Sequence, residues 1–373
     1  MRITEIRLRR LAYPLDPPFV AAWDPTPRRV LEATLVFVST DEGLTGIGSG
    51  DTMDGFERFS RLFLGRDPLE LERHVRVLET AAFHAGRYWP LEAALWDLAG
   101  QAAGVPVAHL LGGKADRIAA YASTGALLPP AERADSALAL FAEGFRALKL
   151  RVEKSRLEEG LATVAAVRAA VGPGPAIMVD LNQGWRMPGD VDELLGYEAV
   201  LEVATRLRAH GVAWLEEPLA RDDVTGLARL RAEGGVPIAG GELARSPGEL
   251  EAFLAAGALD VFQPDGVLAV GLLRARELAE RVLAQGLAFT PHTWTNGIGL
   301  LANLHLAAGV GGGPFLELPY DPPAWTPERR DFMLAEPIGP DADGYLSVPD
   351  RPGLGIELDP DAVERYAVEL EST

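Results

Sequence analysis

Seven ionisable residues stand at or near the ends of short apolar segments, one to a segment. They are Lys149, Asp180, Glu216, Glu242, Asp265, His292 and Glu317. Neighbours in this series are 23 to 36 residues apart, the length of a strand plus a helix with its loops. If the segments are parallel strands, the side chains meet at one edge, where acid–base and metal chemistry can be combined. The alternative is that strand ends carry polar residues only because they enter loops.

Carboxylates end three consecutive segments, at Asp180, Glu216 and Glu242. Three neighbouring acids in a poorly solvated opening raise each other's pKa, and a hard divalent cation removes that conflict. Mg²⁺ is therefore expected, with Mn²⁺ as the alternative ion, whereas zinc would call for His or Cys ligands. Salt-bridged acids without a metal are the competing interpretation. In "WLEEPL", adjacent strand residues face opposite ways, so we choose Glu216 as the ligand and give Glu217 a supporting role.

His292 is the one His of six that ends an apolar segment, and Asp265 ends the segment before it. An Asp beside a His fixes the tautomer of the ring and raises its basicity, as general acid–base catalysis requires. Lys149 lies on the opposite flank, and Glu317, if kept neutral, could donate a hydrogen bond. A metal between cations and a His–Asp pair suits removal of a proton α to a carboxylate, since metal and cations stabilise the resulting enediolate.

Eight apolar segments position these residues and alternate with longer amphipathic stretches. The segments lie near 117–123, 147–152, 176–182, 212–218, 236–242, 259–265, 287–292 and 313–318. Repeated strand–helix units predict parallel strands, and eight of them close into a barrel whose active site lies at the carboxyl ends of the strands. A doubly wound sheet stays open as an alternative fold.

The two ends of the chain have a different pattern. Residues 1–115 begin with alternating strand segments and continue with helical ones, and residues 343–358 resemble a hairpin. The predicted organisation is an α+β capping domain over 1–115, a barrel over 116–325, and a segment over 326–373 that returns to the cap.

Composition excludes several classes of function. The chain of 373 residues has a net charge of −19, which argues against nucleic acid as a partner. It has no cysteine, so disulfides and thiolate nucleophiles are excluded. No apolar run approaches the ~18 residues that a membrane span needs, and no leader pattern opens the chain. We expect a cytoplasmic enzyme that binds neither membrane nor nucleic acid.

The chain resembles the enolase superfamily, and within it the mandelate racemase subgroup, over nearly its whole length. The matching pieces are "LKLRV", "VDLNQGW", "WLEEPL", "GGE", "QPDG", "PHTW" and "FLEL", in this order. The resemblance implies an α/β fold, a (β/α)7β barrel whose α+β cap places loops near 14–28 and 48–55 over a small carboxylate substrate. It also implies Mg²⁺ on the three acids, a His292–Asp265 dyad, Glu317 as electrophilic hydrogen-bond donor and a homo-oligomer. Substrate-binding candidates are Asn182, and Trp23 and Arg28 in the first cap loop.

One position departs from the family pattern. In "ALKLRV" the family usually has Lys-x-Lys, whose second Lys is a base on the face opposite the His, but this chain has Arg151 after Lys149. Arg does not readily lose a proton near neutral pH. Racemisation normally needs two bases, whereas dehydration of a 2,3-dihydroxy acid can use His292 alone as base and then acid.

We therefore predict an acid-sugar dehydratase that serves carbohydrate acid catabolism. The alternative is a racemase or epimerase of a 2-hydroxy acid or an amino acid derivative. Two further classes are a barrel that keeps the metal site without catalysis, and a phosphate-binding barrel suggested by "GVGGG" at 309–313. That glycine run precedes the eighth segment, at the wrong end of a barrel for a phosphate site, so the last class is disfavoured.

Overall fold

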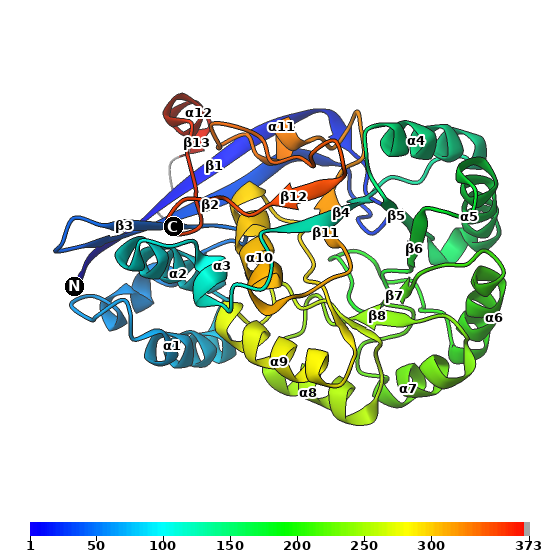
Figure 1. Cartoon of the computed structure of the whole chain (residues 1–373), viewed down its shortest axis with the longest axis horizontal. Coiled ribbons are helices and arrows are strands. Elements are labelled where there is room, and N and C mark those ends of the chain that lie inside the picture. The colour runs from blue at the N-terminus through cyan, green and yellow to red at the C-terminus, as the bar shows by residue number, and fades with distance from the viewer. Residues whose placement is uncertain (369–373) are drawn as a thin grey trace.

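Eight parallel strands form the centre of the molecule, and the last returns to the side of the first (Figure 1). The structure is a computed structural model and describes residues 1–368. The strands are β4 (Arg117–Ser123), β5 (Ala147–Arg151), β6 (Ala176–Asp180), β7 (Leu215–Glu216), β8 (Ile238–Gly240), β9 (Val261–Phe262), β10 (Ala288–Phe289) and β11 (Leu316–Pro319). β4 to β10 pair in chain order and β11 pairs with β4, which is the order of a barrel and not of a doubly wound sheet.

The barrel has a seam between β10 and β11, which share no parallel ladder. Hydrogen bonds between the segments around them link the two strands instead, including two from Thr293 to Glu317. The amide of Gly313 donates to the carbonyl of Phe289 at 2.9 Å, and Oγ1 of Thr290 donates to the carbonyl of Phe315 at 2.5 Å. β10, which leads to His292, and β11, which carries Glu317, are therefore joined less regularly than the other neighbouring strands of the barrel.

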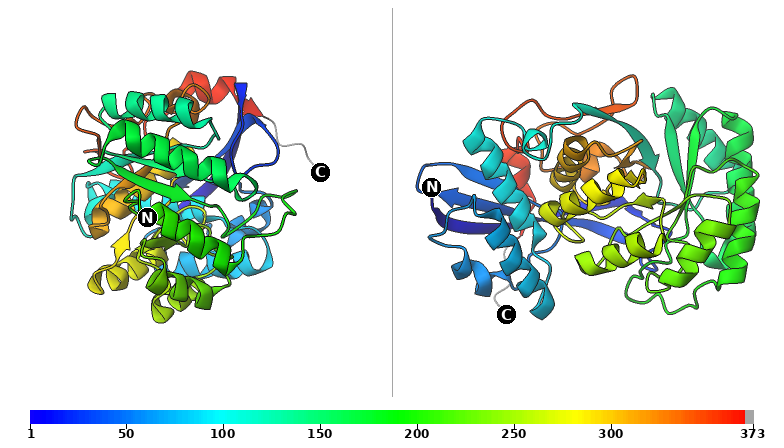
Figure 2. Two further views of the ribbon diagram at one scale, coloured as in Figure 1. Left: turned by 90° about the vertical axis from the view of Figure 1, so that its right-hand side faces the viewer. Right: turned by 60° about the horizontal axis from the view of Figure 1, so that its bottom comes forward.

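Seven α-helices connect the eight strands within 117–319, as the (β/α)7β prediction requires. They are α4 (Pro130–Ala142), α5 (Leu157–Val171), α6 (Tyr197–Arg208), α7 (Val224–Glu233), α8 (Pro247–Ala256), α9 (Leu272–Ala284) and α10 (Gly297–Val310), with the short 3-10 helix η2 (Lys154–Arg156) before α5. The helices lie outside the strands, as both panels of Figure 2 show. Polar side chains begin several of them: Asp223 accepts from the amide of Gly226 at α7, and Asn296 accepts from that of Ile298 at α10.

The alternation of side chains in β5 explains how two cations come to be buried together. Leu148 and Leu150 belong to the apolar core between the barrel and its helices. Lys149 and Arg151 take the opposite, inward face and are both buried. Because successive strand residues face opposite ways, the i, i+2 spacing points both cations into the barrel, as predicted.

The strand register sets functional residues beside one another. Arg151 on β5 is paired with Asp180 on β6, and Asp180 is paired with Glu216 on β7. On the other side, Ser123 at the end of β4 is paired with Lys149. Arg151 and the acids Asp180 and Glu216 thus stand side by side on three neighbouring strands before any side-chain contact is considered.

A second unit, the cap, is built from both ends of the chain. Its sheet has the order β13 (Ala367–Val368), β1 (Ile3–Phe19), β2 (Arg28–Thr40) and β3 (Thr45–Gly48). Its helices are η1 (Phe56–Leu62), α1 (Leu71–His84), α2 (Trp89–Ala103) and α3 (Val107–Leu110), and α12 (Pro360–Arg365) precedes β13. The long β1–β2 hairpin runs from the cap toward the barrel in Figure 1, which carries the loop between the two strands to the barrel opening.

The hairpin predicted for 343–358 is wrong. One short strand of that segment, β12 (Tyr345–Ser347), pairs antiparallel with residues 117–119 of β4, and the short helix α11 (Pro327–Arg330) precedes it. The reason is that β4 begins before its neighbours, which pair only from residue 120 onward, so its first residues offer a free edge. The domain boundaries at 115 and 325 stay a prediction. Among residues 1–368, no helix has the length and apolar character to cross a membrane.

Candidate active site

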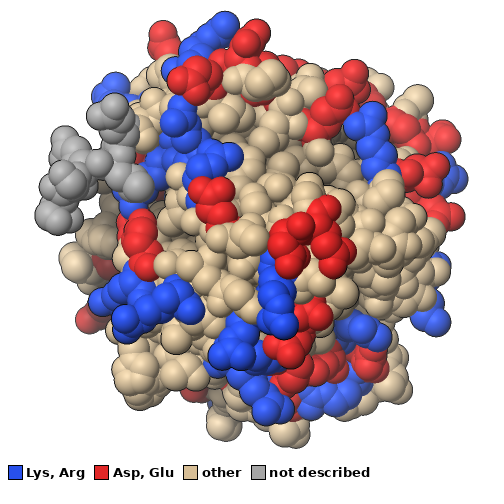
Figure 3. Space-filling model, turned by 90° about the vertical axis from the view of Figure 1, so that its left-hand side faces the viewer, with Lys and Arg blue, Asp and Glu red and all other residues tan. Residues whose placement is uncertain are grey.

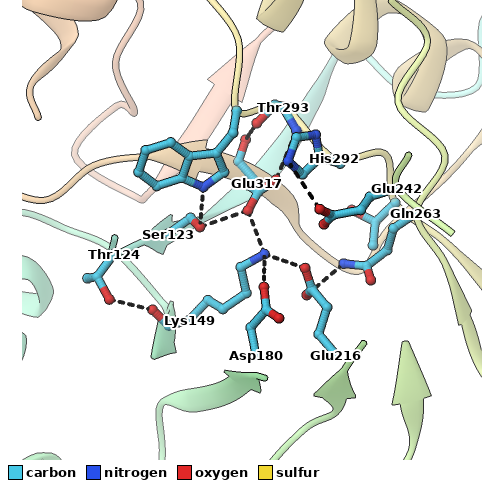
Figure 4. A network of polar contacts seen from close by, with 12 residues as sticks. Ser123, Thr124, Lys149, Asp180, Glu216, Glu242, Gln263, His292, Thr293 and Glu317 are labelled. Carbon is cyan, nitrogen blue, oxygen red and sulfur yellow. Dashed lines mark hydrogen bonds and ion pairs between the residues drawn. The ribbon is translucent and has the colours of Figure 1, made fainter. Parts of the chain in front are cut away.

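The seven residues that the sequence places at strand ends are all buried, and they converge where the barrel strands end (Figure 4). Lys149, Asp180, Glu216 and Glu317 lie in β5, β6, β7 and β11, and Glu242, Asp265 and His292 lie two or three residues beyond β8, β9 and β10. Each side chain therefore reaches the same opening from a different strand. The structure brings together the seven residues that sequence spacing singled out.

Asp180, Glu216 and Glu242 form a cluster of carboxylates. Each offers one oxygen, and these oxygens lie within 4.8 Å of one another. Oε2 of Glu242 is buried and has no hydrogen-bond partner among residues 1–368. Burial and the neighbouring acids raise the pKa of Asp180 and of Glu242. Three oxygen donors, one of them unpartnered, fit a hard divalent cation such as Mg²⁺.

Three side chains that sequence analysis did not single out hold these acids in place. Nε2 of Gln263 donates to Oε2 of Glu216 at 2.9 Å, and Nε1 of Trp214 donates to the same oxygen at 3.0 Å. Nε1 of Trp185 donates to Oε1 of Glu242 at 2.5 Å. All three stand inside or beside the motifs "VDLNQGW", "WLEEPL" and "QPDG", so position in a motif was the available signal. Such contacts fix the orientation of carboxylate ligands.

Glu217 leaves the strand in a left-handed conformation, with φ of 43°. Its buried side chain lies against Gly184, where an added Cβ would meet Oε1 of Glu217 at 2.2 Å. Burial, followed by the charge of Glu242, raises its pKa well above the ordinary value. Of the adjacent pair, only Glu216 belongs to the carboxylate cluster.

Lys149 lies at the centre of the acids. Its Nζ is 2.5 Å from Oε1 of Glu216, 2.7 Å from Oε1 of Glu317 and 3.6 Å from Oδ2 of Asp180. Burial alone would lower the pKa of Lys149, but the acids outweigh burial and raise it above its usual range. The ammonium is therefore a fixed positive charge in the barrel opening.

Glu317 accepts hydrogen bonds at both carboxylate oxygens. Oγ of Ser123 donates to Oε1 at 2.7 Å, and the amide of Thr293 donates to Oε2 at 2.8 Å. Burial favours the neutral form, but Lys149 and His292 outweigh it and lower the pKa of Glu317. These contacts favour the charged form and not the neutral donor that the sequence predicts.

All three nitrogens of the Arg151 guanidinium make contacts with neighbouring groups. Nε donates to the carbonyl of Thr124 at 2.9 Å, Nη2 donates to Oγ of Ser123 at 3.2 Å, and Nη1 pairs with Asp180. The guanidinium carbon lies 4.5 Å from the ring centre of Trp23. Burial opposes the charge, but Asp180 and the other acids raise the pKa of Arg151. A proton acceptor at this position is therefore disfavoured by geometry as well as by the chemistry of guanidinium.

His292 forms the predicted pair with Asp265, with Nδ1 to Oδ2 at 2.9 Å. The other oxygen of Asp265 accepts from the amide of Val267 at 2.8 Å and from Nδ2 of Asn303 at 3.0 Å, which fixes the carboxylate. With Nδ1 donating to Asp265, Nε2 is left as the basic nitrogen. Burial lowers the pKa of His292, but Glu242, Glu317 and Asp265 outweigh burial and raise it to about 9.

The three substrate-binding candidates differ in position. Asn182 touches the site, since its Nδ2 donates to Oδ2 of Asp180 at 3.1 Å and its Oδ1 accepts from Arg151 at 3.2 Å. Trp23, from the loop between β1 and β2, covers Arg151 and meets Trp294 at 4.7 Å between ring centres. Arg28 pairs with Asp24 of its own loop at 2.9 Å, and its guanidinium carbon lies 5.9 Å from the ring centre of Trp23.

Comparisons with known proteins agree with this architecture. The model of the mandelate racemase / muconate lactonizing enzyme N-terminal domain matches residues 4–112, and that of the enolase C-terminal domain-like family matches 132–362. D-galactarolactone cycloisomerase of Agrobacterium fabrum is 30% identical over 98% of this chain and 99% of its own length. Arabinonate dehydratase of Saccharolobus solfataricus is 31% identical over 74% of this chain and 70% of its own. The structure of a racemase from Streptomyces coelicolor with bound magnesium has a TM-score of 0.84 at 27% identity, and the match covers 98% of this chain and 100% of that one.

Proposed function

The chain belongs to the mandelate racemase / muconate lactonizing enzyme family of the enolase superfamily, and on that premise we propose that it catalyses β-elimination from an acid sugar. In the proposed reaction the α-proton of a 2,3-dihydroxy carboxylate is removed and the β-oxygen leaves. Loss of the β-oxygen as water makes the enzyme a dehydratase. The product is then a 2-keto-3-deoxy acid.

The observation that carries this proposal is the environment of Arg151. A two-base racemisation needs a proton acceptor on each face of the α-carbon, and Arg151 occupies the position of the second base. Its guanidinium is bound to Thr124, Ser123 and Asp180 and keeps its charge. One basic side chain, His292, then remains for proton transfer, and elimination requires only one.

In the proposed mechanism Nε2 of His292 removes the α-proton while Asp265 stabilises the imidazolium at Nδ1. Lys149 and Arg151 stabilise the negative charge that develops on the substrate carboxylate. The same imidazolium then returns its proton to the departing β-oxygen, so His292 ends the cycle neutral. Asp180, Glu216 and Glu242 would hold Mg²⁺, which when bound adds positive charge beside the carboxylate.

A cycloisomerase is the second candidate, because D-galactarolactone cycloisomerase is one of the relatives that match the chain almost from end to end. If the β-oxygen is part of a ring, the same elimination opens the ring and no water is lost. The residues do the same work in both reactions, so the two candidates differ only in what the β-oxygen is bound to. Racemisation is the less favoured alternative, because of Arg151.

A panel of acid sugars and their lactones, incubated with Mg²⁺ in D₂O and followed by NMR, tests the proposal. We expect a keto acid, formed with loss of water from an open-chain acid or without loss from a lactone. His292→Asn should abolish product formation, whereas His109→Asn, at an exposed position of α3, should leave it unchanged. α-Deuterated acid of inverted configuration without any keto acid would overturn the proposal in favour of a racemase.

A further inference from the structure

A pocket with a volume of about 340 Å³ lies between the cap and the barrel. It is lined by the cap loop after β3, the turn between α1 and α2, and one residue of the barrel. The lining residues that bear on its chemistry are Asp51, Thr52, Asp54, Arg87, Tyr88 and Arg245. The sequence analysis named none of them as a site residue, although Asp51, Thr52 and Asp54 belong to the cap loop near 48–55 that it expects over the substrate.

The positive charge of Arg87 is only partly balanced, because Asp51 lies near it but forms no ion pair with it among the described residues. Nη1 of Arg87 is buried and makes no hydrogen bond, and neither Arg87 nor Arg245 forms a side-chain ion pair within residues 1–368. Asp54 is already paired with Arg10 outside the pocket. Asp51 has one oxygen on the amide of Thr52 at 2.7 Å, and burial raises its pKa to about 6. A buried guanidinium nitrogen without a partner is costly unless an anion completes it.

Chain connections place this pocket next to the reacting residues. Arg245 follows the carboxylate ligand Glu242 by three residues, on the loop after β8. Gly50 of the cap loop packs so closely on Val267, two residues after Asp265, that an added Cβ would lie 2.4 Å from its Cγ2. Oγ of Ser49 accepts from Nδ2 of Asn296, just beyond His292, at 2.9 Å. These contacts place the cap loop of the pocket against the segments that follow Asp265 and His292.

We propose that this pocket binds a second, terminal carboxylate, so that the substrate is a dicarboxylic acid sugar; this rests on the proposed function. Arg87 and Arg245 present planar donor sets that suit a carboxylate, and Asp51 accepts hydrogen bonds from the hydroxyl groups between the two ends. A sugar acid that ends in a neutral hydroxymethyl group leaves Nη1 of Arg87 without an anion. Sites built to bind a polar group reject the analogue that lacks it.

The test compares a monocarboxylic and a dicarboxylic acid sugar of the same chain length and configuration. Wild-type kcat/KM should favour the diacid at least about tenfold, equal to about 1.4 kcal/mol. Arg87→Gln and Arg245→Gln should each raise KM for the diacid about 10- to 100-fold and change the monoacid values little. Arg87→Lys, which keeps the charge, should recover part of the loss. Arg61→Gln, at an exposed position of the cap, is the matched control and should change neither substrate.

Calorimetry of both acids with the His292→Asn variant and Mg²⁺ separates this proposal from the proposed function. If no acid sugar is turned over by the wild type, the proposed function fails, while a diacid preference in binding still supports the pocket assignment. Equal binding of the two acids overturns the assignment, as does an equal loss for both acids in Arg87→Gln. A preference for a monoacid with a terminal phosphate over the diacid also overturns it.

Discussion

The contacts of the Arg151 side chain distinguish it from the Lys that the family pattern has at this position. A Lys at this position would present one ammonium at the end of a flexible chain. The guanidinium instead reaches the carbonyl of Thr124, Oγ of Ser123 and the carboxylate of Asp180 at once. The structure around it is complementary to Arg, so this residue is more than a neutral replacement of the Lys in the family pattern.

Arg151→Lys should therefore lower kcat by about 10- to 100-fold, because the ammonium cannot replace the planar contacts or the stacking on Trp23. The effect is measured by the rate of elimination and by the exchange of the α-proton for deuterium in each of the two C2 epimers of the substrate. Arg156→Lys, at an exposed position of η2, is the control. A variant that gains exchange on both faces without losing elimination would show that the position serves as a base once a Lys is present.

The sequence could predict most of the site because parallel strands bring their carboxyl ends together. Asp180, Glu216, Glu242, Asp265 and His292 needed only the spacing of the strands. Contacts between side chains were out of reach: Gln263 and Trp214 both donate to Glu216, and their place in the motifs does not say which acid they contact. The charge of Glu317 was also out of reach, since it depends on how close Lys149 comes.

Helix α2 illustrates an element buried on nearly every side. It lies between the cap sheet and the start of α9, and its backbone approaches Gly46 and Gly48 so closely that a Cβ on either would lie within 2.1 Å of a carbonyl oxygen. Inside this apolar helix, Oε1 of Glu92 accepts from the amide of Leu273 at 2.8 Å and caps the first turn of α9. Burial, partly offset by that bond, raises the pKa of Glu92 to about 7.

This pKa predicts how stability depends on pH. Between pH 4.5, the ordinary pKa of a Glu, and pH 7, the folded chain keeps a proton on Glu92 that the unfolded chain loses. The contribution of Glu92 to stability is therefore present at low pH and falls as the pH rises to about 7, by on the order of 3 kcal/mol. Glu92→Gln should gain stability relative to the wild type over this range, as measured by urea unfolding at pH 5 and pH 8. The exposed Glu57→Gln should show no such gain in stability. An equal change in the free energy of unfolding for both variants would refute the raised pKa of Glu92 as the cause.

At the level of elements, the sequence predicted the eight strands and their order because buried parallel strands are continuous apolar runs. It predicted the wrong partner for β12, because the partner of that strand is set by the extra length of β4 and not by any local turn. It also missed the pocket around Arg87, which forms only when a cap loop and a barrel loop meet. Contacts between distant elements carry no periodic signal.

At the scale of the whole molecule, the cap and the barrel meet at the site, and acids from three strands share one cluster. On the cap end of the molecule, Lys and Arg are interspersed with Asp and Glu (Figure 3). Exposed ion pairs of this kind, such as Arg9 with Glu364, contribute little to stability. The charges inside the barrel affect stability more strongly, because buried acids destabilise the folded state until a cation balances them.

Mg²⁺ should therefore stabilise the entire chain. At one hundred times its Kd, an ion that binds only the folded state adds about 2.7 kcal/mol to the free energy of unfolding, seen as a rise in Tm of the wild type. Glu242→Gln should lose most of this rise, because Oε2 of Glu242 is the unpartnered donor of the cluster. Glu57→Gln should keep it. An equal rise in Tm for both variants would place the ion elsewhere.

The pairing of β13 with β1 has a consequence for how the protein is made. The amide of Ala12 donates to the carbonyl of Tyr366 at 2.8 Å, and Arg10 is paired with Val368, so β1 is joined by a strand that is translated more than 300 residues later. The barrel segment is complete well before that final strand has been translated. The cap sheet acquires its fourth strand only after the barrel segment has been synthesised, and the nascent chain carries an open β1 edge until residues 367–368 have been translated.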